Sequence, residues 1–248
     1  MKEINLIPWD SKILNKKVFE IKYQKGLPLK TLAKLDKSCE KQDAYYVFIK
    51  VDNDDIKTIH YLETLGFNYI EFQLRIEKRL VKPYTLPHYK NFYLKEIFKS
   101  DVDDIKNICK IAKTTFTTDR FYIDPKINKD FSGKRYMNWI LNSLEDNTYK
   151  IYKYCFKSND EIAAFLMVKK DKDKIYIALG GTNPKFKGSG IYLSLLIEYL
   201  NLSYLNKNKN IYTTITALNK DVVDFYNLLE FKIIDRKVVL RKVYEHER

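Results

Sequence analysis

Residues 185–192 read KFKGSGIY and join IYIALGG, a run typical of a buried strand, to LSLLIEYL, a run typical of a helix. The chain has seven glycines in 248 residues, and four of them lie at this junction: Gly180, Gly181, Gly188 and Gly190. A glycine-rich turn from a strand into a helix places free backbone N–H groups at the positive end of the helix dipole. Because this geometry binds phosphate groups, the junction is the first candidate for a site.

Two interpretations of the junction are open. In the first, Gly188 and Gly190 let the backbone approach an anion, and Lys185 and Lys187 add positive charge beside it. In the second, the segment is a surface turn before a helix whose apolar face begins at Ile191. The segment matches neither GxxxxGK followed by Ser or Thr nor GxGxxG, so these common nucleotide-binding loops are excluded.

The composition favours a packed globular protein. Hydrophobic residues make up 45% of the chain and aromatic residues 15%, with only six prolines. Cys39, Cys109 and Cys155 and the three histidines show no spacing typical of disulfides or of a zinc site, so we expect a cytoplasmic protein without a metal. No apolar run approaches the ~18 to 20 residues of a membrane span, and MKEINLIPWDSK does not read as a signal peptide, so we expect no membrane insertion.

The charge is strongly positive. Forty-five Lys and Arg against 32 Asp and Glu give a formal net charge of +13, which attracts polyanions such as nucleic acid or phosphorylated small molecules. The lysines are scattered along the whole chain, and no basic and aromatic motif is concentrated anywhere. We therefore keep a nucleic-acid-binding protein as an alternative and expect no nucleic-acid partner.

The chain contains a repeat. Residues 44–80 read as strand, helix and strand, and residues 211–243 repeat this order. An offset of 164 residues places LETLGF on YNLLEF, with Leu65 on Leu229 and Phe67 on Phe231. The second copy has Asn219 and Tyr226 at positions where the first copy has Asp55 and Leu62, and only the second copy follows a glycine junction. If the repeat is more than a chance similarity of two amphipathic helices, a site belongs to the second half.

The segment KPYTLPHYK at residues 82–90 interrupts the pattern with two prolines. We expect a boundary there between an N-terminal domain (1–84) and a C-terminal domain (91–248). The C-terminal domain continues with a strand, a helix, a long connection, a second helix and three strands before the junction. This order predicts a mixed α/β (α+β) fold.

The junction resembles a known family. Residues 185–190 look like the Q/R-x-x-G-x-G/A pyrophosphate loop of GNAT-type acyl-CoA N-acyltransferases, with Lys185 in place of Gln or Arg. Asn219, Tyr226 and Phe231 resemble the second signature of this family, with Glu230 in place of the family's Gly. The resemblance implies a mixed, mostly antiparallel sheet flanked by helices, with a smaller degenerate GNAT-like N-terminal half. Tyr226, otherwise an ordinary core tyrosine, becomes a candidate site residue.

Two further segments narrow the resemblance. IPWDSKILNKKVFEI (residues 7–21) and DRFYIDPKINKDFSGKRYMNWILNSL (residues 119–144) are similar to the dTDP-fucosamine acetyltransferase branch of the family. The chain departs from that branch at LNKK, where a Gly-containing turn is usual. The resemblance implies an acceptor that is a nucleotide-linked amino-deoxy sugar and an acyl donor that is acetyl-CoA.

The resemblance places the pantetheine of acetyl-CoA along the strand IYIALGGT and its pyrophosphate on backbone N–H groups of residues 186–191. A backbone N–H near Gly181 or Thr182 polarises the thioester carbonyl. Tyr226 is the general acid for the departing thiolate, since a phenol with a pKa of ~10 gives up a proton more readily than it removes one from an ammonium. The residues assigned to acetyl-CoA are Gly181, Thr182, Phe186, Lys187, Gly188, Ser189, Gly190, Ile191 and Asn219.

The acceptor site is implied by DRFYIDP. Arg120, Tyr122 and Asp124 are assigned to sugar or diphosphate contacts, with an ordinary capped loop as the alternative. The general base stays open between Asp119, Asp124 and water, and we favour water. A GNAT enzyme acting on a protein N-terminus or another small amine is the alternative within the family, and the oligomeric state stays open, a homodimer included.

Overall fold

The computed structural model describes residues 3–85 and 89–244. The strands are β1 (Ile4–Leu6), β2 (Lys17–Ile21), β3 (Ala44–Asp52), β4 (Asn68–Arg79), β5 (Phe92–Ile97), β6 (Tyr149–Phe156), β7 (Ile162–Asp171), β8 (Lys174–Thr182), β9 (Asn210–Thr216) and β10 (Lys232–Val243). The helices are α1 (Pro8–Leu14), α2 (Leu29–Lys41), α3 (Ile56–Thr64), α4 (Val102–Thr115), α5 (Arg120–Ile123), α6 (Asp130–Ser143), α7 (Ile191–Leu205) and α8 (Lys220–Leu228), with a short 3-10 turn, η1 (Pro184–Phe186).

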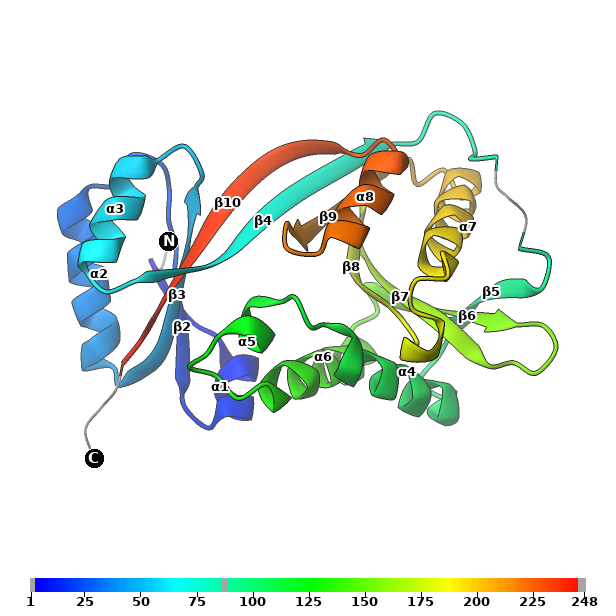
Figure 1. Ribbon diagram of the computed structural model, residues 1–248, viewed down its shortest axis with the longest axis horizontal. Coiled ribbons are helices and arrows are strands. Elements are labelled where there is room, and N and C mark those ends of the chain that lie inside the picture. Colours follow the sequence, from blue (N-terminus) through cyan, green and yellow to red (C-terminus); the bar gives the residue numbers. More distant parts are fainter. Residues whose placement is uncertain (1–2, 86–88, 245–248) are drawn as a thin grey trace.

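All ten strands belong to one sheet, in the order β1-β2-β3-β10-β4-β9-β8-β7-β6-β5. Among the described residues, only the β2–β3 and β8–β9 pairs are parallel, so the sheet is mostly antiparallel. Helices cover it, and Figure 1 shows α2 and α3 at one end of the molecule and α7 and α8 at the other. This arrangement confirms the expected fold class.

The repeat seen in the sequence is a repeat of structure. The offset of 164 residues carries the bounds of α3 onto those of α8 and the bounds of β4 onto those of β10. Both helices begin with a side-chain cap, in which Asp55 accepts a hydrogen bond from the N–H of Thr58 and Asn219 accepts one from the N–H of Val222. Equivalent residues thus start equivalent helices.

The two repeats exchange their last strands. β10, from the second repeat, pairs with β3 of the first, while β4, from the first, pairs with β9 of the second. The two exchanged strands pair with each other along their length and cross the middle of the molecule side by side (Figure 1). The boundary expected at residues 82–90 falls between β4 and β5, and residues 86–88 lie outside the described residues. Two domains stay a prediction, and the sheet itself is continuous.

The turn after α8 forms without the family's glycine. Gly66 follows α3 with φ +86°, and Glu230, at the equivalent position after α8, has φ +58°. A side chain in this left-handed region is strained, so the turn is held by its surroundings. The Glu230 carboxylate lies 2.7 Å from the Nζ of Lys78. The tight exit from the helix is therefore kept despite the substitution.

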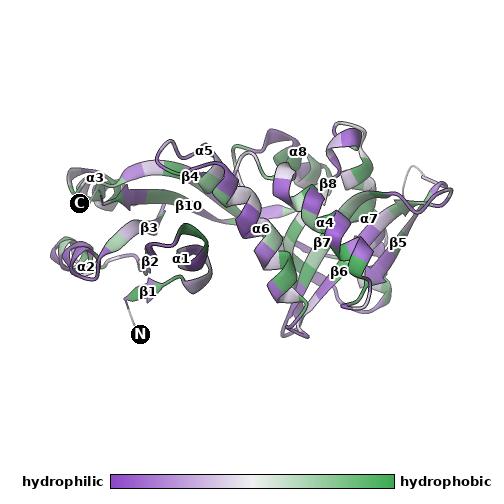
Figure 2. Cartoon of the chain, turned by 90° about the horizontal axis from the view of Figure 1, so that it is seen from below, coloured by the Kyte–Doolittle hydropathy of each residue, from purple (hydrophilic) through white to green (hydrophobic). Residues whose placement is uncertain are grey.

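The sheet is buried on both faces at β7. β7 sends Ala164, Leu166 and Val168 into a core beneath α7, and Phe165 and Met167 into a core beneath α4 and α6. This explains why IAAFLMV is continuously apolar instead of alternating. Figure 2 shows hydrophobic and hydrophilic segments alternating along α6, as expected for a helix with one face on the sheet.

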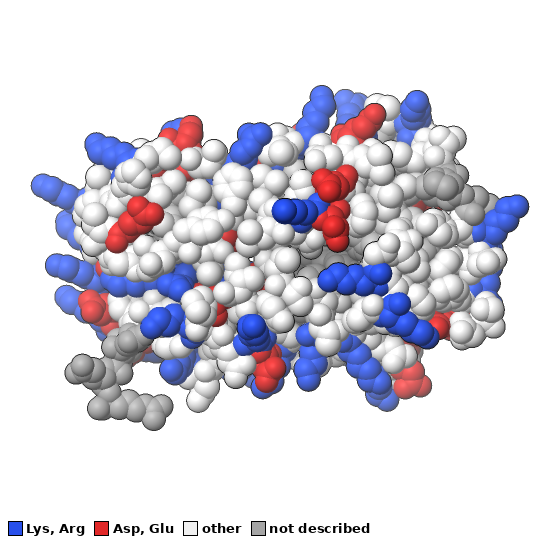
Figure 3. All heavy atoms as spheres, in the orientation of Figure 1, with Lys and Arg blue, Asp and Glu red and all other residues white. Residues whose placement is uncertain are grey.

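The described residues hold no helix long and apolar enough to cross a membrane. The same residues contain no group of three or more His, Cys, Asp or Glu side chains that could hold a metal ion. Cys39, Cys109 and Cys155 are buried and not joined in disulfides. Figure 3 shows the basic side chains of one face scattered over the face and its edge and not gathered in one patch.

Candidate active site

The parallel strands β8 and β9 pair only over part of their length. Their ladder ends at Ile177 and Thr213, and beyond it, within the described residues, β8 pairs only with β7 and β9 only with β4. A β-bulge marks the point of divergence, since Ala178 has no partner in β7. Such bulges bend a strand away from its neighbour and are frequent beside active sites. The two strands therefore splay apart and leave unpaired backbone groups facing the gap.

A cavity of about 310 Å³ fills this gap, and we call it the splay cavity. Both strands line it, together with the start of α8 and parts of α5 and α6. Of the residues discussed from the sequence, the cavity is lined by Asp119, Arg120, Gly180, Asn219 and Tyr226. The structure thus brings together residues as far apart in the sequence as Asp119 and Tyr226.

Tyr226 is 2% exposed and turns toward the splay cavity from α8. Its ring packs edge-on against Phe231, with centroids 4.9 Å apart, and the side chains of Tyr192 and Thr213 lie near enough to its hydroxyl to influence its pKa. The Thr213 hydroxyl also donates to the carbonyl of Ile177 over 2.8 Å, across the last rung of the β8–β9 ladder. Burial raises the pKa of Tyr226 well above its ordinary value, so the phenol stays protonated at neutral pH.

Tyr192, from the first turn of α7, fills the space beside β8. A Cβ added to Gly180 would lie 2.4 Å from the Tyr192 hydroxyl, so the glycine makes room for this side chain. Burial raises the pKa of Tyr192 to about 12. Gly180 therefore leaves the space that Tyr192 occupies, and Tyr192 in turn influences the pKa of the candidate residue Tyr226.

We expect Gly180→Ala to displace the Tyr192 ring and thereby the Tyr226 hydroxyl. Because small misplacements of reacting groups are costly, kcat in an acetyltransferase assay should fall by about 10- to 100-fold. The midpoint temperature of unfolding should change little, since the crowded atoms belong to the end of one side chain. Unchanged turnover in a variant that has wild-type stability would show that Tyr192 does not position the site.

The glycine junction forms a turn at the start of α7. Gly188 and Gly190 have φ +79° and +76°, which explains why glycine stands at both positions. The N–H groups of Phe186, Lys187 and Ser189 are bonded to carbonyls within the turn itself. The donors left for a ligand are therefore those of Gly188 and Gly190 and the first turn of α7, fewer than the run from Phe186 to Ile191 expected from the sequence.

The two lysines beside this turn, Lys185 and Lys187, differ in whether their charge is already paired. Lys185 pairs with Glu161 over 2.8 Å and is 65% exposed, whereas Lys187 is exposed and has no partner among the described residues. Gly181 and Thr182 end β8 behind the turn, and a Cβ on Gly181 would lie 2.9 Å from the ring of Phe165. Lys187 is thus the charge that a bound anion would meet.

The Asn219 side chain uses its oxygen for a structural hydrogen bond and leaves its amide nitrogen for a ligand. Its side-chain oxygen caps α8 by accepting from the N–H of Val222 over 3.3 Å, and its amide nitrogen has no partner among the described residues. Because Asn219 also lines the splay cavity, the nitrogen is available to a ligand there.

The residues assigned to the acceptor fall into three positions. Arg120 lines the splay cavity, and its NH1 lies 3.3 Å from Glu71. Tyr122 lies under the Nζ of Lys129, 5.3 Å from its ring centre, and lines none of the described cavities. Asp124 is 2% exposed and holds Arg241 of β10, so the structure places it away from the splay cavity. Of the three, only Arg120 reaches the cavity.

Asp119, considered as a base, does line the splay cavity. Its carboxylate accepts hydrogen bonds from the Ser132 hydroxyl and, over 2.8 Å, from the N–H of Phe121. Burial raises the pKa of Asp119 above its ordinary value. The carboxylate is therefore less readily ionised than an exposed one.

Sequence reasoning missed part of the cavity wall. Lys50 of β3, Glu71 and Gln73 of β4, and Arg135 of α6 line the splay cavity, and the first three come from the half that was expected to hold no site. Polar residues at every second position, Glu71, Gln73 and Arg75, were a usable signal, since they mark one face of β4. Nothing in the sequence showed that β4 pairs with β9.

Comparisons with known proteins agree with this fold. No family model matches the chain. It is 22% identical over 227 residues to the spore coat polysaccharide biosynthesis protein SpsD of Bacillus subtilis (strain 168), covering 90% of this chain and 76% of the relative. A GCN5-related N-acetyltransferase (GNAT) from Sphaerobacter thermophilus superposes with a TM-score of 0.70 at 12% identity, covering 97% of this chain and 76% of that one. The chain has the GNAT fold.

A second solved structure extends the GNAT likeness. A tandem GNAT protein from the clavulanic acid biosynthesis pathway superposes with a TM-score of 0.60 at 10% identity, covering 93% of this chain and 76% of that one. Both structures cover nearly the whole chain, so the GNAT fold includes the N-terminal repeat. This confirms the fold expected from the glycine junction and from Asn219 and Tyr226.

Proposed function

We propose that the protein is an N-acetyltransferase that transfers the acetyl group of acetyl-CoA to the amine of a nucleotide-linked amino-deoxy sugar. The observation that carries the proposal is the splay of β8 from β9, with Tyr226 beside the gap and the N-terminus of α7 at its end. A gap edged by unpaired strand backbone accepts an extended amide-containing chain as it would accept a further strand. The pantetheine arm of acetyl-CoA is such a chain.

The diphosphate of acetyl-CoA fits the turn before α7. Gly188 and Gly190 present open N–H groups, and the first turn of α7 adds the positive end of a 15-residue helix. Charge-assisted hydrogen bonds contribute ~1.5–3 kcal/mol each, against ~0.3–1 kcal/mol for the helix dipole. The backbone donors therefore dominate, and Lys187 adds to them.

The reaction is a direct attack. The lone pair of the neutral amine forms a C–N bond to the thioester carbonyl carbon, and the C–S bond then breaks with its electrons on sulfur. Tyr226 donates its proton to this sulfur, the positively charged nitrogen of the intermediate releases its extra proton to water, and the phenolate regains a proton from water. Burial raises the pKa of Tyr226, so the phenol still carries its proton when the thiolate forms.

The amine must lose a proton before it attacks, and we propose water as the acceptor. Asp124 is paired with Arg241 outside the cavity, and Asp119 already accepts two hydrogen bonds within it. Neither carboxylate is placed as a free base.

An amino sugar is the acceptor that the relatives favour. SpsD carries a name from polysaccharide biosynthesis, and residues 7–21 and 119–144 resemble the dTDP-fucosamine acetyltransferase branch. The test is to incubate the protein with acetyl-CoA and a panel of nucleotide-linked amino sugars, N-terminal peptides and small amines, and to follow thiol release with a chromogenic reagent. Turnover with peptides alone would replace the sugar with a protein N-terminus, and no release with any amine would overturn the proposal.

The proposed diphosphate site makes a separate prediction. We expect Lys187→Glu to weaken acetyl-CoA binding about tenfold in calorimetry, because it replaces an unpaired cation with an anion beside the phosphates. Lys110→Glu, an equal charge change at an exposed position of α4, is the matched control and should leave the affinity unchanged. Equal affinities of the two variants would show that the turn does not bind the donor.

A further inference from the structure

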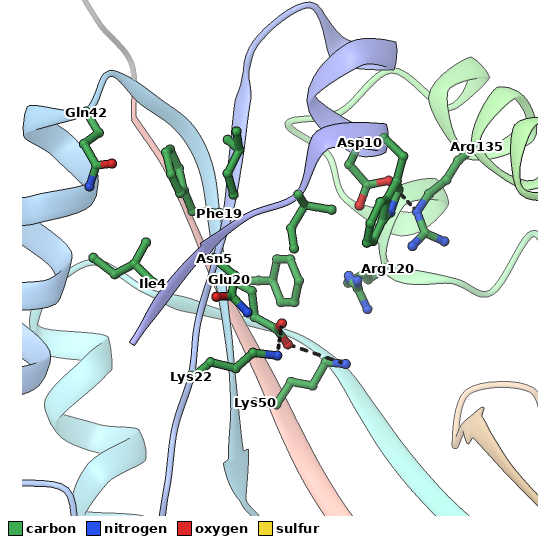
Figure 4. Close-up of a pocket in the computed structure, with 14 residues that line it drawn as sticks. Ile4, Asn5, Asp10, Phe19, Glu20, Lys22, Gln42, Lys50, Arg120 and Arg135 are labelled. Atoms are coloured by element: carbon green, nitrogen blue, oxygen red, sulfur yellow. Dashed lines mark hydrogen bonds and ion pairs between the residues drawn. The ribbon is translucent and has the colours of Figure 1, made fainter. Parts of the chain in front are cut away.

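A second, larger cavity lies in the N-terminal half, and we call it the N-terminal pocket. Its volume is about 680 Å³, within the range of about 300–1,000 Å³ that is usual for small-molecule sites. Its walls come from β1, α1, β2 and β3 and, from the other half, α5 and α6 (Figure 4). The proposed acetyl transfer assigns no role to it.

The N-terminal pocket meets the splay cavity at three cations. Lys50, Arg120 and Arg135 line both spaces. Figure 4 shows the Arg120 guanidinium between the Arg135–Asp10 pair and the amine of Lys50. A ligand that extends from one space into the other must therefore pass these three side chains.

Arg120 and Arg135 are each held by contacts with neighbouring residues, and both keep N–H groups that can bind a ligand. The Arg120 guanidinium lies 4.6 Å from the ring centre of Phe48 and gives one N–H to Glu71, while its buried Nε–H has no partner among the described residues. Arg135 gives its Nε–H to Asp10 over 2.7 Å. Fixed guanidinium groups with free N–H donors suit the paired oxygens of phosphates.

Lys50 is an incompletely neutralised cation. Its only carboxylate partner among the described residues is Glu20, 3.9 Å away, and Glu20 is held more closely by Lys22 at 2.6 Å. Partial burial and the charge of Arg120 lower the pKa of Lys50 to about 8. An anion bound between Lys50 and Arg120 would relieve this repulsion.

The rest of the pocket offers apolar surface. Trp9 is 53% exposed and Leu6 48% exposed, and both line the pocket together with Phe19 and Phe48. An exposed tryptophan beside cations is suited to stacking against a heterocyclic base. The pocket therefore joins an aromatic end to a cationic end.

We propose that the N-terminal pocket binds the nucleoside diphosphate part of the acceptor, with the diphosphate on Lys50, Arg120 and Arg135 and the base against Trp9. The sugar amine then extends into the splay cavity beside Tyr226. This inference rests on the proposed function. It gives the N-terminal repeat, which lacks the glycine junction, Asn and Tyr, the task of holding the acceptor.

The test measures binding without turnover. Uridine 5′-diphosphate, thymidine 5′-diphosphate, inorganic pyrophosphate and uridine are titrated into the full chain by calorimetry, with and without saturating acetyl-CoA. The diphosphates should bind more tightly than pyrophosphate or uridine and should still bind when acetyl-CoA is present. In the Trp139→Phe variant, where Trp9 is the remaining tryptophan, the diphosphates should quench fluorescence.

Two variants locate the ligand. Lys50→Met should weaken diphosphate binding about 10- to 100-fold, while Lys57→Met on the exposed face of α3 should not. Trp9→Ala should weaken the nucleoside diphosphates about tenfold and leave pyrophosphate unchanged, and Tyr69→Ala, at an equally exposed aromatic, is its control. Each affinity is measured beside the midpoint temperature of unfolding, so a folding defect is recognised.

The pH dependence of diphosphate affinity distinguishes a lysine that contacts the ligand from one that has only a structural role. Diphosphate affinity should fall as the pH rises above about 8, where Lys50 loses its charge, and this fall should be absent in Lys50→Met. The charged groups facing Lys50 are Arg120, Glu20, Glu71 and Lys22. A fall of equal size in both proteins would overturn the assignment to Lys50.

The outcomes separate this inference from the proposed function. If acetyl-CoA binds and no nucleoside diphosphate does, or if acetyl-CoA displaces the diphosphates one for one, the acceptor pocket is overturned and the donor site stands. If the diphosphates bind through Lys50 and Trp9 but acetyl-CoA does not bind, the pocket stands and the acetyltransferase is overturned.

Discussion

Tyr226→Phe is expected to lower kcat by about 10²- to 10⁴-fold, the usual cost of losing a general acid. The affinity for acetyl-CoA should change little, since the hydroxyl acts on the sulfur only as the C–S bond breaks. Phenylalanine keeps the ring against Phe231, and the Thr213 hydroxyl keeps its bond to Ile177, so the fold should be preserved. Thiol release under saturating substrates gives kcat, and calorimetry gives the affinity.

The control must also lose a buried phenol. Tyr199 of α7 is 4% exposed and does not line the splay cavity, so Tyr199→Phe should keep wild-type kcat. Tyr192→Phe tests whether the proton donor is Tyr226 or its neighbour Tyr192. We expect this variant to keep far more activity than Tyr226→Phe, because in the proposed mechanism Tyr192 only orients the Tyr226 hydroxyl. Full turnover by Tyr226→Phe would remove Tyr226 from the mechanism, and a larger loss in Tyr192→Phe would make Tyr192 the acid.

The pH profile should agree with a buried acid. Because burial raises the pKa of Tyr226 well above its ordinary value, the hydroxyl keeps its proton as the pH rises. The kcat of the wild-type enzyme should therefore show no alkaline fall up to pH ~10, the ordinary pKa of tyrosine. A fall centred near pH 8 would indicate that a different group supplies the proton.

The repeat could be read from the sequence, but the strand exchange could not. The offset that joins Phe67 to Phe231 also joins the bounds of α3 to α8 and of β4 to β10. The strand pairing could not be predicted in the same way. β4 and β10 are equivalent strands, and the local pattern of either strand would allow it to lie beside β3 or β9. The choice depends on contacts between the halves, which no local periodicity records.

The same exchange explains which site residues were missed. Tyr226 and Asn219 could be predicted because they form a second family signature that follows the glycine junction in the sequence. Both line the splay cavity. Lys50 and Glu71 reach that cavity only because β4 pairs with β9 and brings the first repeat alongside. The roles of Lys50 and Tyr226 stay predictions, which the variants of these two residues test.

Asp124→Asn is expected to lower the free energy of unfolding by about 3–5 kcal/mol, the usual cost of breaking a buried ion pair from one side. Asp124 receives two hydrogen bonds from Arg241, Nε at 2.7 Å and NH2 at 3.0 Å, and the Tyr46 hydroxyl lies 3.3 Å away. The Arg241 side chain is 10% exposed, so removing the carboxylate leaves a positive charge in the interior. Urea unfolding followed by circular dichroism measures the loss.

The comparison that decides the role of Asp124 uses both stability and kinetics. Asp54→Ala breaks the exposed pair with Lys25 and should leave the urea midpoint unchanged, because such pairs contribute little. Arg241→Met combined with Asp124→Asn should recover part of the stability, since it removes the uncompensated charge. At temperatures where Asp124→Asn is fully folded, its KM for the acceptor should equal that of the wild type. A raised KM with an unchanged urea midpoint would return Asp124 to the acceptor site, whereas the expected pattern makes it the anchor of β10, the exchanged strand that joins the two halves.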